Sequence, residues 1–424
     1  MKTVLIQTLG CKVNQYESST IADQFRNMGY HCVSEAEHPH VFVINTCTVT
    51  NSADSKSRNL IRRALRAKAE DPRIRIFVTG CYAQRSIDEI RTMGDIDLVI
   101  DNQVKLDISQ WFETADYQWH DIMRTETFHY LPVSRMLDHT RAFQKIQDGC
   151  NFSCSYCAVP YARGKSRSCS FEDVISQTKL LVANGYKEIV LGGVNLGLYH
   201  DKGKDLGDVI IAIHEIPELK LIRLSSIEPQ LINSKILDCL ASLPKLCPHI
   251  HIPLQAGSDS VLMRMKRNYN TNLIKNLVRD IRSLRPGIAI GFDIICGFPA
   301  ESDTEHREGL ALLEDLEPTY LHVFTYSKRK GTPAALMKNQ VHGSIAKTRA
   351  DQLQGLNIQF QNRYKNMLIE HATPLKGIIE ETHKGYATAL SDHYIRIYIH
   401  DTAKINTEIN ITPKTIHGDG ICGT

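Results

Sequence analysis

The sequence predicts a mixed α/β protein built from three parts. These are an N-terminal doubly wound α/β domain, a partial (βα)6 barrel and a small antiparallel β-barrel. Two series of apolar strand-like runs, each alternating with helical runs, predict the first two parts. A change to strictly alternating residues near the C-terminus predicts the third. The chain has 424 residues, which is enough for two or three domains.

The first part contains three apolar runs, each of which precedes a cysteine. The runs are "KTVLIQT" (2–8), "HVFVINT" (40–46) and "RIFVTG" (75–80). A stretch with helical character follows each run, for example "SKSRNLIRRALRAKAE" (55–70). This order is typical of a parallel sheet with helices between its strands. We expect residues 1–112 to form this domain and residues 113–136 to act as a connector.

The second part repeats the same rhythm six times, and we expect it to span residues 137–370. Six parallel strands suit an incomplete βα barrel, in which the reactive groups sit at the C-terminal ends of the strands. The expected strands are "AFQKIQDG" (142–149), "KEIVLGGV" (187–194), "LKLIRLSS" (219–226), "HIHIPLQ" (249–255), "IAIGFDIICG" (288–297) and "YLHVFTYS" (320–327).

The last part, residues 371–424, has strand-like composition throughout. In "HYIRIYIH" (393–400), Tyr394, Arg396 and Tyr398 alternate with isoleucines at a period of two. Turn residues separate this run from "DTAKINTEINITP" (401–413). The pattern favours a small antiparallel barrel attached to the core.

Composition narrows the class of protein. The net charge of +3 permits an acidic partner such as RNA without requiring one. No apolar run approaches the ~18 residues of a membrane span, and "MKTVLIQTLGC" becomes polar too early for a signal peptide. We therefore expect a cytoplasmic protein with no membrane partner. In that compartment the 12 cysteines are reduced, which favours metal ligation over disulfides.

Three of these cysteines crowd into "IQDGCNFSCSYCAVPYARG" (146–164). The spacing of Cys150, Cys154 and Cys157 places three thiolates on one loop, each able to bind a separate iron of a four-iron cluster. Three ligands leave one iron open to a small molecule. The alternatives are a zinc site built on Cys154 and Cys157, or buried structural cysteines. Zinc needs a fourth ligand at suitable spacing, and no second pair is nearby.

Three other cysteines are far apart in sequence but occupy equivalent places. Cys11, Cys47 and Cys81 each follow a predicted strand, in "LGC", "NTC" and "TGC". The loops after parallel strands meet along one edge of a sheet, so these thiolates can hold a second cluster with one open iron. The alternative is that all three are buried core residues.

At the first triad the chain resembles the radical S-adenosylmethionine superfamily. The resemblance implies that the open iron binds S-adenosylmethionine, that Tyr156 lies near its adenine, and that Gly192 and Gly193 approach its methionine amine. The glycine segment reads "LGGVN", without the acidic residue often found there. Further candidates for cofactor contact follow later strands, namely Ser226, Glu228 and Gln255.

The order of the six cysteines and the three parts resembles the methylthiotransferases of this superfamily, whose C-terminal barrel is called TRAM. "TLGCKVNQYES" (8–18) and "HVFTYSKRKGTPAA" (322–335) are similar to the branch that acts on threonylcarbamoyl-adenosine in tRNA. "GFPAES" departs from the family's "GFPGE" at Ala300. The resemblance implies two [4Fe-4S] clusters, S-adenosylmethionine and a low-potential electron donor such as flavodoxin or ferredoxin. It implies transfer of a methylthio group to C2 of the adenine beside the anticodon, at tRNA position 37.

Two alternatives remain at this stage. The same chemistry can serve an isopentenylated adenosine or a ribosomal protein. A protein of another class, a non-catalytic iron–sulfur sensor or RNA-binding protein, would carry the cysteines without the reaction. For RNA contact we expect Arg163, Lys165 and Arg167 beside the first triad, and Arg396 on the C-terminal barrel. A basic run over residues 56–75 is a further candidate, although a solvated helix face explains it equally well.

Overall fold

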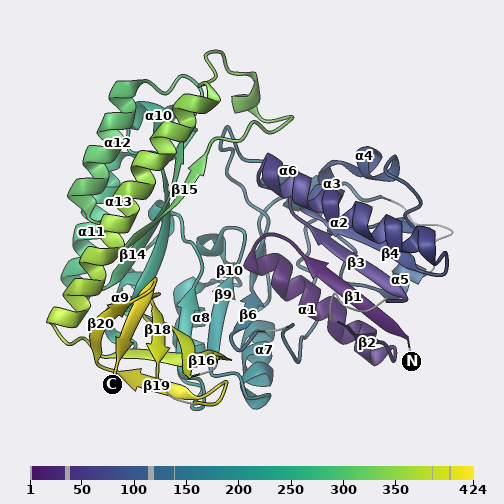
Figure 1. Cartoon of the computed structure of the whole chain (residues 1–424), viewed down its shortest axis with the longest axis horizontal. Helices are drawn as coiled ribbons and strands as arrows, with labels where there is room; N and C mark the ends of the chain where they lie inside the picture. The colour runs from purple at the N-terminus through teal and green to yellow at the C-terminus, as the bar shows by residue number, and fades with distance from the viewer. Residues whose placement is uncertain (1, 34–38, 113–118, 138, 384, 401–402) are drawn as a thin grey trace.

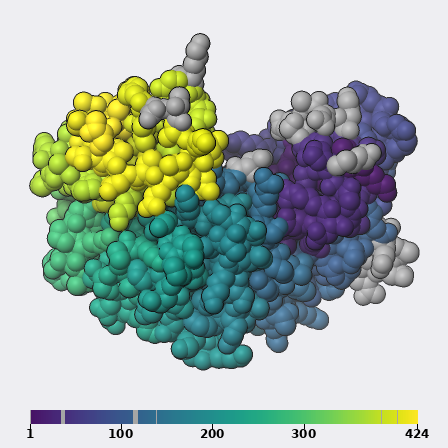
Figure 2. All heavy atoms as spheres, turned by 90° about the horizontal axis from the view of Figure 1, so that it is seen from below, coloured from purple at the N-terminus to yellow at the C-terminus, as the bar shows by residue number. Residues whose placement is uncertain are grey.

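The computed structural model describes residues 2–33, 39–112, 119–137, 139–383, 385–400 and 403–424. Residues 113–118 of the expected connector lie outside this set. The N-terminal sheet stands beside a curved central set of strands, and the C-terminal sheet lies at the base of that set (Figure 1). In the space-filling view the two terminal parts form separate lobes on the core (Figure 2). No helix within the described ranges combines the length and apolar character needed to cross a bilayer.

The N-terminal part is a five-stranded parallel sheet in the order β2-β1-β3-β4-β5. Helix α1 covers one face with Ile21 and Phe25, and helix α2 covers the other with Ile61 and Ala64. The doubly wound prediction is therefore confirmed. The elements are β1 Thr3–Thr8, α1 Lys12–Asn27, β2 His31–Cys32, β3 Val41–Thr46, α2 Asn51–Glu70, β4 Arg75–Gly80, α3 Cys81–Arg85, α4 Ile87–Arg91, β5 Leu98–Val99 and α5 Ser109–Phe112.

The core contains the six predicted parallel strands, in two groups of three ordered β12-β9-β6 and β13-β14-β15. A parallel bridge between Ile222 and Leu246 links the groups. The strands are β6 Ala142–Lys145, β9 Glu188–Gly192, β12 Leu221–Leu224, β13 His249–Gln255, β14 Ala289–Cys296 and β15 Tyr320–Thr325. Strands β6 and β15 end this series, so the barrel is open between them.

The remaining core elements connect and cover these strands. The helices are α6 Val159–Arg163, α7 Phe171–Ala183, α8 Leu206–His214, α9 Ser234–Ser242, α10 Asp259–Arg264, α11 Thr271–Leu284, α12 Asp303–Leu316 and α13 Gly343–Glu370. The short pieces are η2 Ile122–Arg124, β7 Gln147–Asp148, β8 Arg167–Ser168, η3 Leu196–Leu198, β10 His200–Asp201, β11 Lys204–Asp205, η4 Pro229–Leu231 and η5 Pro333–Leu336.

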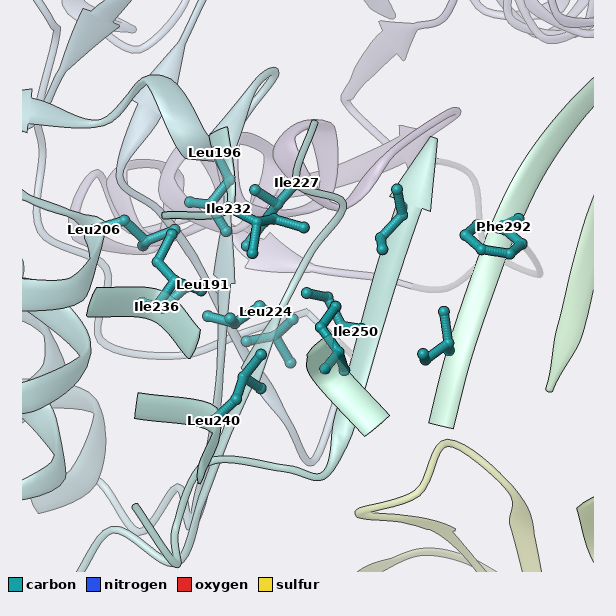
Figure 3. Packing of buried hydrophobic residues seen from close by; sticks show 14 of the residues in the cluster. Leu191, Leu196, Leu206, Leu224, Ile227, Ile232, Ile236, Leu240, Ile250 and Phe292 are labelled. Atoms are coloured by element: carbon teal, nitrogen blue, oxygen red, sulfur yellow. The ribbon is translucent and has the colours of Figure 1, made fainter. Parts of the chain in front are cut away.

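Alternation along the core strands separates an apolar outer layer from a polar inner one. Leu191, Leu224 and Ile250 pack in one apolar cluster with residues of α8 and α9, such as Leu206 and Leu240 (Figure 3). The side chains of neighbouring strand residues point to the opposite face. That inner face carries His251, Asp293 and His322, joined by hydrogen bonds between His251 and Asp293 (3.0 Å) and between His322 and Asp293 (3.3 Å). The barrel interior is therefore suited to a polar occupant.

The C-terminal part is a curled six-stranded sheet in the order β19-β16-β17-β18-β21-β20. Its strands are β16 Leu375–His383, β17 Tyr386–Ser391, β18 Arg396–Ile399, β19 Glu408–Ile411, β20 Pro413–His417 and β21 Gly420–Gly423. Strands β19 and β20 are consecutive in the chain but lie at opposite edges of the sheet, where β19 pairs with β16 and β20 pairs with β21. The sheet curls because these two edges must come close together. The pairing departs from the antiparallel prediction at β18 and β21, which run parallel.

The alternation predicted for residues 393–400 is wrong at Tyr394. Strand β18 begins only at Arg396, and Tyr394 precedes it with a positive φ of 62°. Its ring stacks on His249 of β13, with the ring centroids 4.5 Å apart. Beside it, Arg223 of β12 donates to the carbonyl of Ser391 at 2.9 Å. Tyr394 thus attaches the C-terminal sheet to the base of the core.

Candidate functional site

The loop of the first triad is held in a closed shape by its own backbone. It follows β7, and Gly149 at its start has φ +72°; a Cβ there would lie 1.9 Å from the carbonyl oxygen of Lys165. Cys150 N donates to the carbonyl of Gly164 at 3.0 Å, and Cys157 N donates to that of Cys154 at 3.1 Å. Only a glycine at 149 therefore allows these two chain segments to touch.

Polar groups from other elements surround the three sulfurs. Cys150 Sγ accepts from the side-chain amide of Asn195 at 3.6 Å, and Cys154 Sγ accepts from Arg267 Nη1 at 3.1 Å. Burial raises the pKa of Cys157 to about 12. Burial also raises the pKa of Cys154, although Arg267 opposes this. Such thiols remain protonated at neutral pH, so a bound metal is needed to hold them as thiolates.

Arg267 is a site residue that the sequence analysis missed. Its guanidinium lies between Cys154 and Glu228, with which it forms an ion pair, and Nη1 is 3.5 Å from the hydroxyl of Tyr156. Arg267 Nε donates to Tyr269 at 3.0 Å. Burial raises the pKa of Glu228, and Arg267 opposes this shift. The only available sequence signal was that Arg267 lies in the segment "MKRNY" (265–269), between the fourth core strand and the helix α11.

The other predicted cofactor residues lie near the C-terminal ends of β9, β12 and β13. A Cβ on Gly193 would lie 2.8 Å from Gln147 Oε1, which accepts from Asn195 N at 2.8 Å. Gly192 is buried, Ser226 is exposed, and Gln255 is half-buried with φ 64°. In the described part of the chain, Asn195 Oδ1 and Ser225 Oγ are buried without a hydrogen-bond partner. These unpaired atoms at neighbouring strand ends fit a polar ligand such as S-adenosylmethionine.

The three dispersed cysteines meet at one edge of the N-terminal sheet. Cys47 and Cys81 directly follow the adjacent strands β3 and β4, and Cys11 follows the end of β1 after Leu9 and Gly10. Gly10 has φ +100°, and a Cβ there would lie 2.8 Å from Cys47 Sγ. Gly80 has φ +96°, and its Cβ would lie 2.4 Å from the carbonyl of Thr46. The glycines of "LGC" and "TGC" therefore bring the three loops together, and this signal was present in the sequence.

A site for a single metal ion needs its ligand atoms closer together than a site for an iron–sulfur cluster does. Within the described ranges, the one set of three metal-binding side chains with all ligand atoms within 4.8 Å is His251, Asp293 and His322. Neither cysteine triad is grouped this tightly. A tetrahedral zinc site with Zn–S bonds of ~2.3 Å needs sulfurs closer than this. An iron–sulfur cluster does not require ligand atoms this close together, because each thiolate binds a different iron.

The structure corrects the prediction that Arg163 and Arg167 contact RNA. Arg163 is 1% exposed and Arg167 is 8% exposed. Arg163 donates to Cys81 Sγ at 3.2 Å and to Glu17 Oε1 at 2.6 Å, so its guanidinium is turned toward the N-terminal sheet. Lys165 and Arg396 are exposed. Arg396 lies 3.6 Å from Asp419.

One segment of the core contacts residues that neighbour both triads. Arg329, after β15, donates to Thr48 at 2.7 Å and to Asp54 at 2.6 Å, close to Cys47. Five residues later, Ala334 N donates to the carbonyl of Ser155, which lies between Cys154 and Cys157. This segment, residues 327–334, fixes the two cysteine sites relative to each other.

Comparisons with known proteins agree with this arrangement. Residues 3–101 match the family described as "Uncharacterized protein family UPF0004", and residues 145–313 match the radical SAM superfamily. A Bacillus subtilis (strain 168) protein named threonylcarbamoyladenosine tRNA methylthiotransferase MtaB is 37% identical over 415 residues, covering 95% of this chain and 91% of that protein. A Thermotoga maritima protein of the same name is 34% identical, covering 93% and 91%.

A differently named relative and a solved structure extend the comparison. A Chromobacterium violaceum tRNA-2-methylthio-N(6)-dimethylallyladenosine synthase is 35% identical over 350 residues, covering 79% of this chain and 78% of that protein. The radical S-adenosylmethionine methyltransferase TsrM from Kitasatospora setae, solved with cobalamin and a [4Fe-4S] cluster bound, aligns with a TM-score of 0.58 and 14% identity. The alignment covers 79% of this chain and 77% of TsrM, and at 14% identity it shows that the two proteins share a fold.

Proposed function

The chain belongs to the radical S-adenosylmethionine methylthiotransferase family, and from this we propose that it adds a methylthio group to C2 of N6-threonylcarbamoyladenosine at tRNA position 37. The observation that supports the proposal is the pairing of two three-cysteine sites, held together by Arg163 and by residues 327–334. Membership of an enzyme family argues against the non-catalytic sensor. We also propose that the chain divides into the N-terminal cluster domain (1–112), a connector (113–136), the radical core (137–370) and the C-terminal barrel (371–424).

In this proposal each triad holds one [4Fe-4S] cluster. When bound, the two clusters and S-adenosylmethionine supply one-electron chemistry and sulfur, which ordinary side chains cannot provide. Cys150, Cys154 and Cys157 would hold the first cluster, and Cys11, Cys47 and Cys81 the second. Asn195 and Ser225, with Tyr156, Gly192, Gly193, Ser226, Glu228 and Gln255 near them, would bind S-adenosylmethionine. A flavodoxin or ferredoxin would supply electrons.

The substrate branch is supported by charge as well as by the names of the relatives. The threonylcarbamoyl group carries a carboxylate, which an isopentenyl group lacks. Burial, followed by repulsion from Arg223 and Arg141 of the core, lowers the pKa of Lys12, next to Cys11, to about 8, and Lys12 makes no ion pair within the described ranges. Its ammonium can therefore pair with the substrate carboxylate. Lys12→Met should raise KM for a threonylcarbamoyl substrate and leave an isopentenyl substrate unaffected.

The tRNA would be bound by exposed basic side chains. Lys165 beside the first triad and Arg396 on the C-terminal sheet are candidates, as are Lys56, Arg62 and Arg66 on α2, which are exposed. Each phosphate contact contributes ~0.7–0.9 to the slope of log affinity against log salt concentration. Lys165→Gln should lower the slope by about that amount. An unchanged slope would remove Lys165 from the interface.

The direct test is an assay with protein reconstituted without oxygen. We expect tRNA carrying threonylcarbamoyladenosine to gain a methylthio group, detected by mass spectrometry of its nucleosides. The matched substrates are tRNA carrying isopentenyladenosine and the ribosomal protein of the same-chemistry alternative. Modification of either of these, without modification of the first tRNA, would overturn the substrate assignment. Iron analysis of Cys11→Ala and Cys150→Ala should show the loss of about half the iron in each.

A further inference from the structure

A buried ionic cluster joins the N-terminal sheet to the core next to the dispersed triad. Each of its six residues is at most 8% exposed, and they come from α1, β6, β7, α6, β8 and the loop after β5. They are Glu17, Lys105, Lys145, Asp148, Arg163 and Arg167. The cluster therefore lies at the contact between the two parts that carry the cysteine triads.

Arg163 and Glu17 form the centre of this ionic cluster. Arg163 Nη1 lies 2.6 Å from Glu17 Oε1, and Nη2 lies 2.9 Å from Glu17 Oε2. Glu17 also pairs with Lys105 and, at 2.9 Å, with Lys145. Burial alone would raise the pKa of Glu17, but these three cations hold it well below its usual range. Glu17 is therefore ionised.

The second carboxylate, Asp148, pairs with the remaining cation. Asp148 Oδ2 lies 3.1 Å from Lys145, 3.3 Å from Arg163 and 3.6 Å from Arg167. Four cations thus share two carboxylates, so these six side chains together carry a net charge of +2. An excess of buried positive charge is unfavourable, and negative charge held nearby would offset it.

The dispersed triad is the nearest source of that negative charge. Arg163 Nε donates to Cys81 Sγ at 3.2 Å, and Arg163 also interacts electrostatically with Cys11. Three thiolates outnumber the two positive charges of an oxidised four-iron, four-sulfide core, so a cluster held here carries net negative charge. That charge increases when the cluster accepts an electron. Net charge and hydrogen bonds to sulfur are among the factors that set the reduction potential of such clusters.

We propose that the buried ionic cluster is the counter-charge of the iron–sulfur cluster on Cys11, Cys47 and Cys81, with Arg163 as its positioning residue. This inference rests on the second cluster of the proposed function. The Arg163 guanidinium orients the Cys81 thiolate and stabilises the reduced form, so it raises the reduction potential. Because Arg163 follows Cys157 by six residues, the same side chain fixes the first triad's loop against the second cluster.

The test isolates the second cluster and measures its midpoint potential. In full-length protein carrying Cys150→Ala, Cys154→Ala and Cys157→Ala, the remaining cluster is titrated with dithionite and followed by electron paramagnetic resonance. Arg163→Gln should lower the ratio of reduced to oxidised cluster about tenfold at a fixed potential, a shift of ~59 mV for one electron. Glu17→Gln, which removes a negative charge, should move the potential the opposite way.

Matched variants separate charge from structure. Arg163→Lys keeps the charge and should recover most of the potential, whereas Arg124→Gln removes an exposed guanidinium and should leave it unchanged. If Arg163→Gln fails to fold, the midpoint potential of Glu17→Gln still tests the proposal, because it should rise. Unchanged potentials in both variants would overturn the inference. If the parent protein binds no iron, the second cluster of the proposed function is wrong instead.

Discussion

Arg267 Nη1 lies 3.1 Å from Cys154 Sγ, although the two residues are 113 positions apart in the chain. Arg163 makes the equivalent contact with Cys81 at 3.2 Å. Each cysteine triad therefore has one sulfur that accepts a hydrogen bond from a buried guanidinium. Both arginines also pair with a glutamate, Glu228 and Glu17 respectively. The two sites use the same arrangement of charge.

Removing Arg267 should separate its structural and functional roles. Arg267→Met leaves Glu228 buried without a cation, which should destabilise the protein by ~3–5 kcal/mol. The double variant Arg267→Met/Glu228→Met removes both charges and should recover most of the melting temperature. Cleavage of S-adenosylmethionine should remain at least tenfold below wild type in both. Wild-type cleavage by the double variant would show that Arg267 serves stability alone.

Gly10 should be essential for the second cluster. Gly10→Ala places a Cβ 2.8 Å from Cys47 Sγ, so the loop must shift and iron bound at the dispersed triad should be lost. Gly29→Ala is the matched control, because Gly29 also has a positive φ but has no atom within 4 Å of its added Cβ. Iron analysis of anaerobically purified proteins measures the effect. Equal iron in both variants would contradict the close approach of the two loops.

Arg329 should couple the two cysteine sites without holding either cluster. Arg329→Met removes its hydrogen bonds to Thr48, Asn51 and Asp54. We expect full iron content but at least a tenfold loss of methylthiolation, because the relative position of the sites is no longer fixed. Lys328→Met, which removes an exposed neighbour, is the control. A wild-type rate for Arg329→Met would rule out this coupling.

Ala300 should carry backbone strain. It occupies a left-handed conformation with φ 60°, at the position where the family's "GFPGE" pattern has glycine. An alanine in this region costs ~1 kcal/mol or more relative to glycine. Ala300→Gly should therefore raise the melting temperature by a few degrees, as measured by circular dichroism. A lower melting temperature would show that neighbouring contacts outweigh the strain.

Glu305 should make stability depend on pH on the acid side. A hydrogen bond from Arg264 lowers the pKa of Glu305 to about 2 from its usual 4.5. Because the folded pKa is depressed, the stabilisation is complete above pH 4.5 and is lost as the pH falls toward 2. Glu305→Gln should lower the melting temperature at pH 7 and have less effect near pH 3. Glu314→Gln, an exposed change on the same helix, should show no such trend.

The periodicity of the sequence determined the strands of this protein. Apolar runs and the helices between them predicted β1, β3 and β4 of the first sheet and all six core strands, because burial imposes a local pattern on each strand. The same patterns placed six cysteines at strand ends and on one loop. Glycines before Cys11 and Cys81 were also visible, since close approach of neighbouring loops demands them.

The tertiary structure alone decided which charged side chains belong to the site. Arg163 lies close to the exposed Lys165 in the sequence. In the structure it is buried, where it pairs with Glu17, which is 146 residues away. Arg267 reaches Cys154 only because the segment between α10 and α11 packs against the loop after β7. Tyr394 leaves its strand pattern to stack on His249 of the core. Local pattern reports whether a backbone is helix or strand, but the partner of a charge or a ring depends on contacts between distant segments that periodicity does not encode.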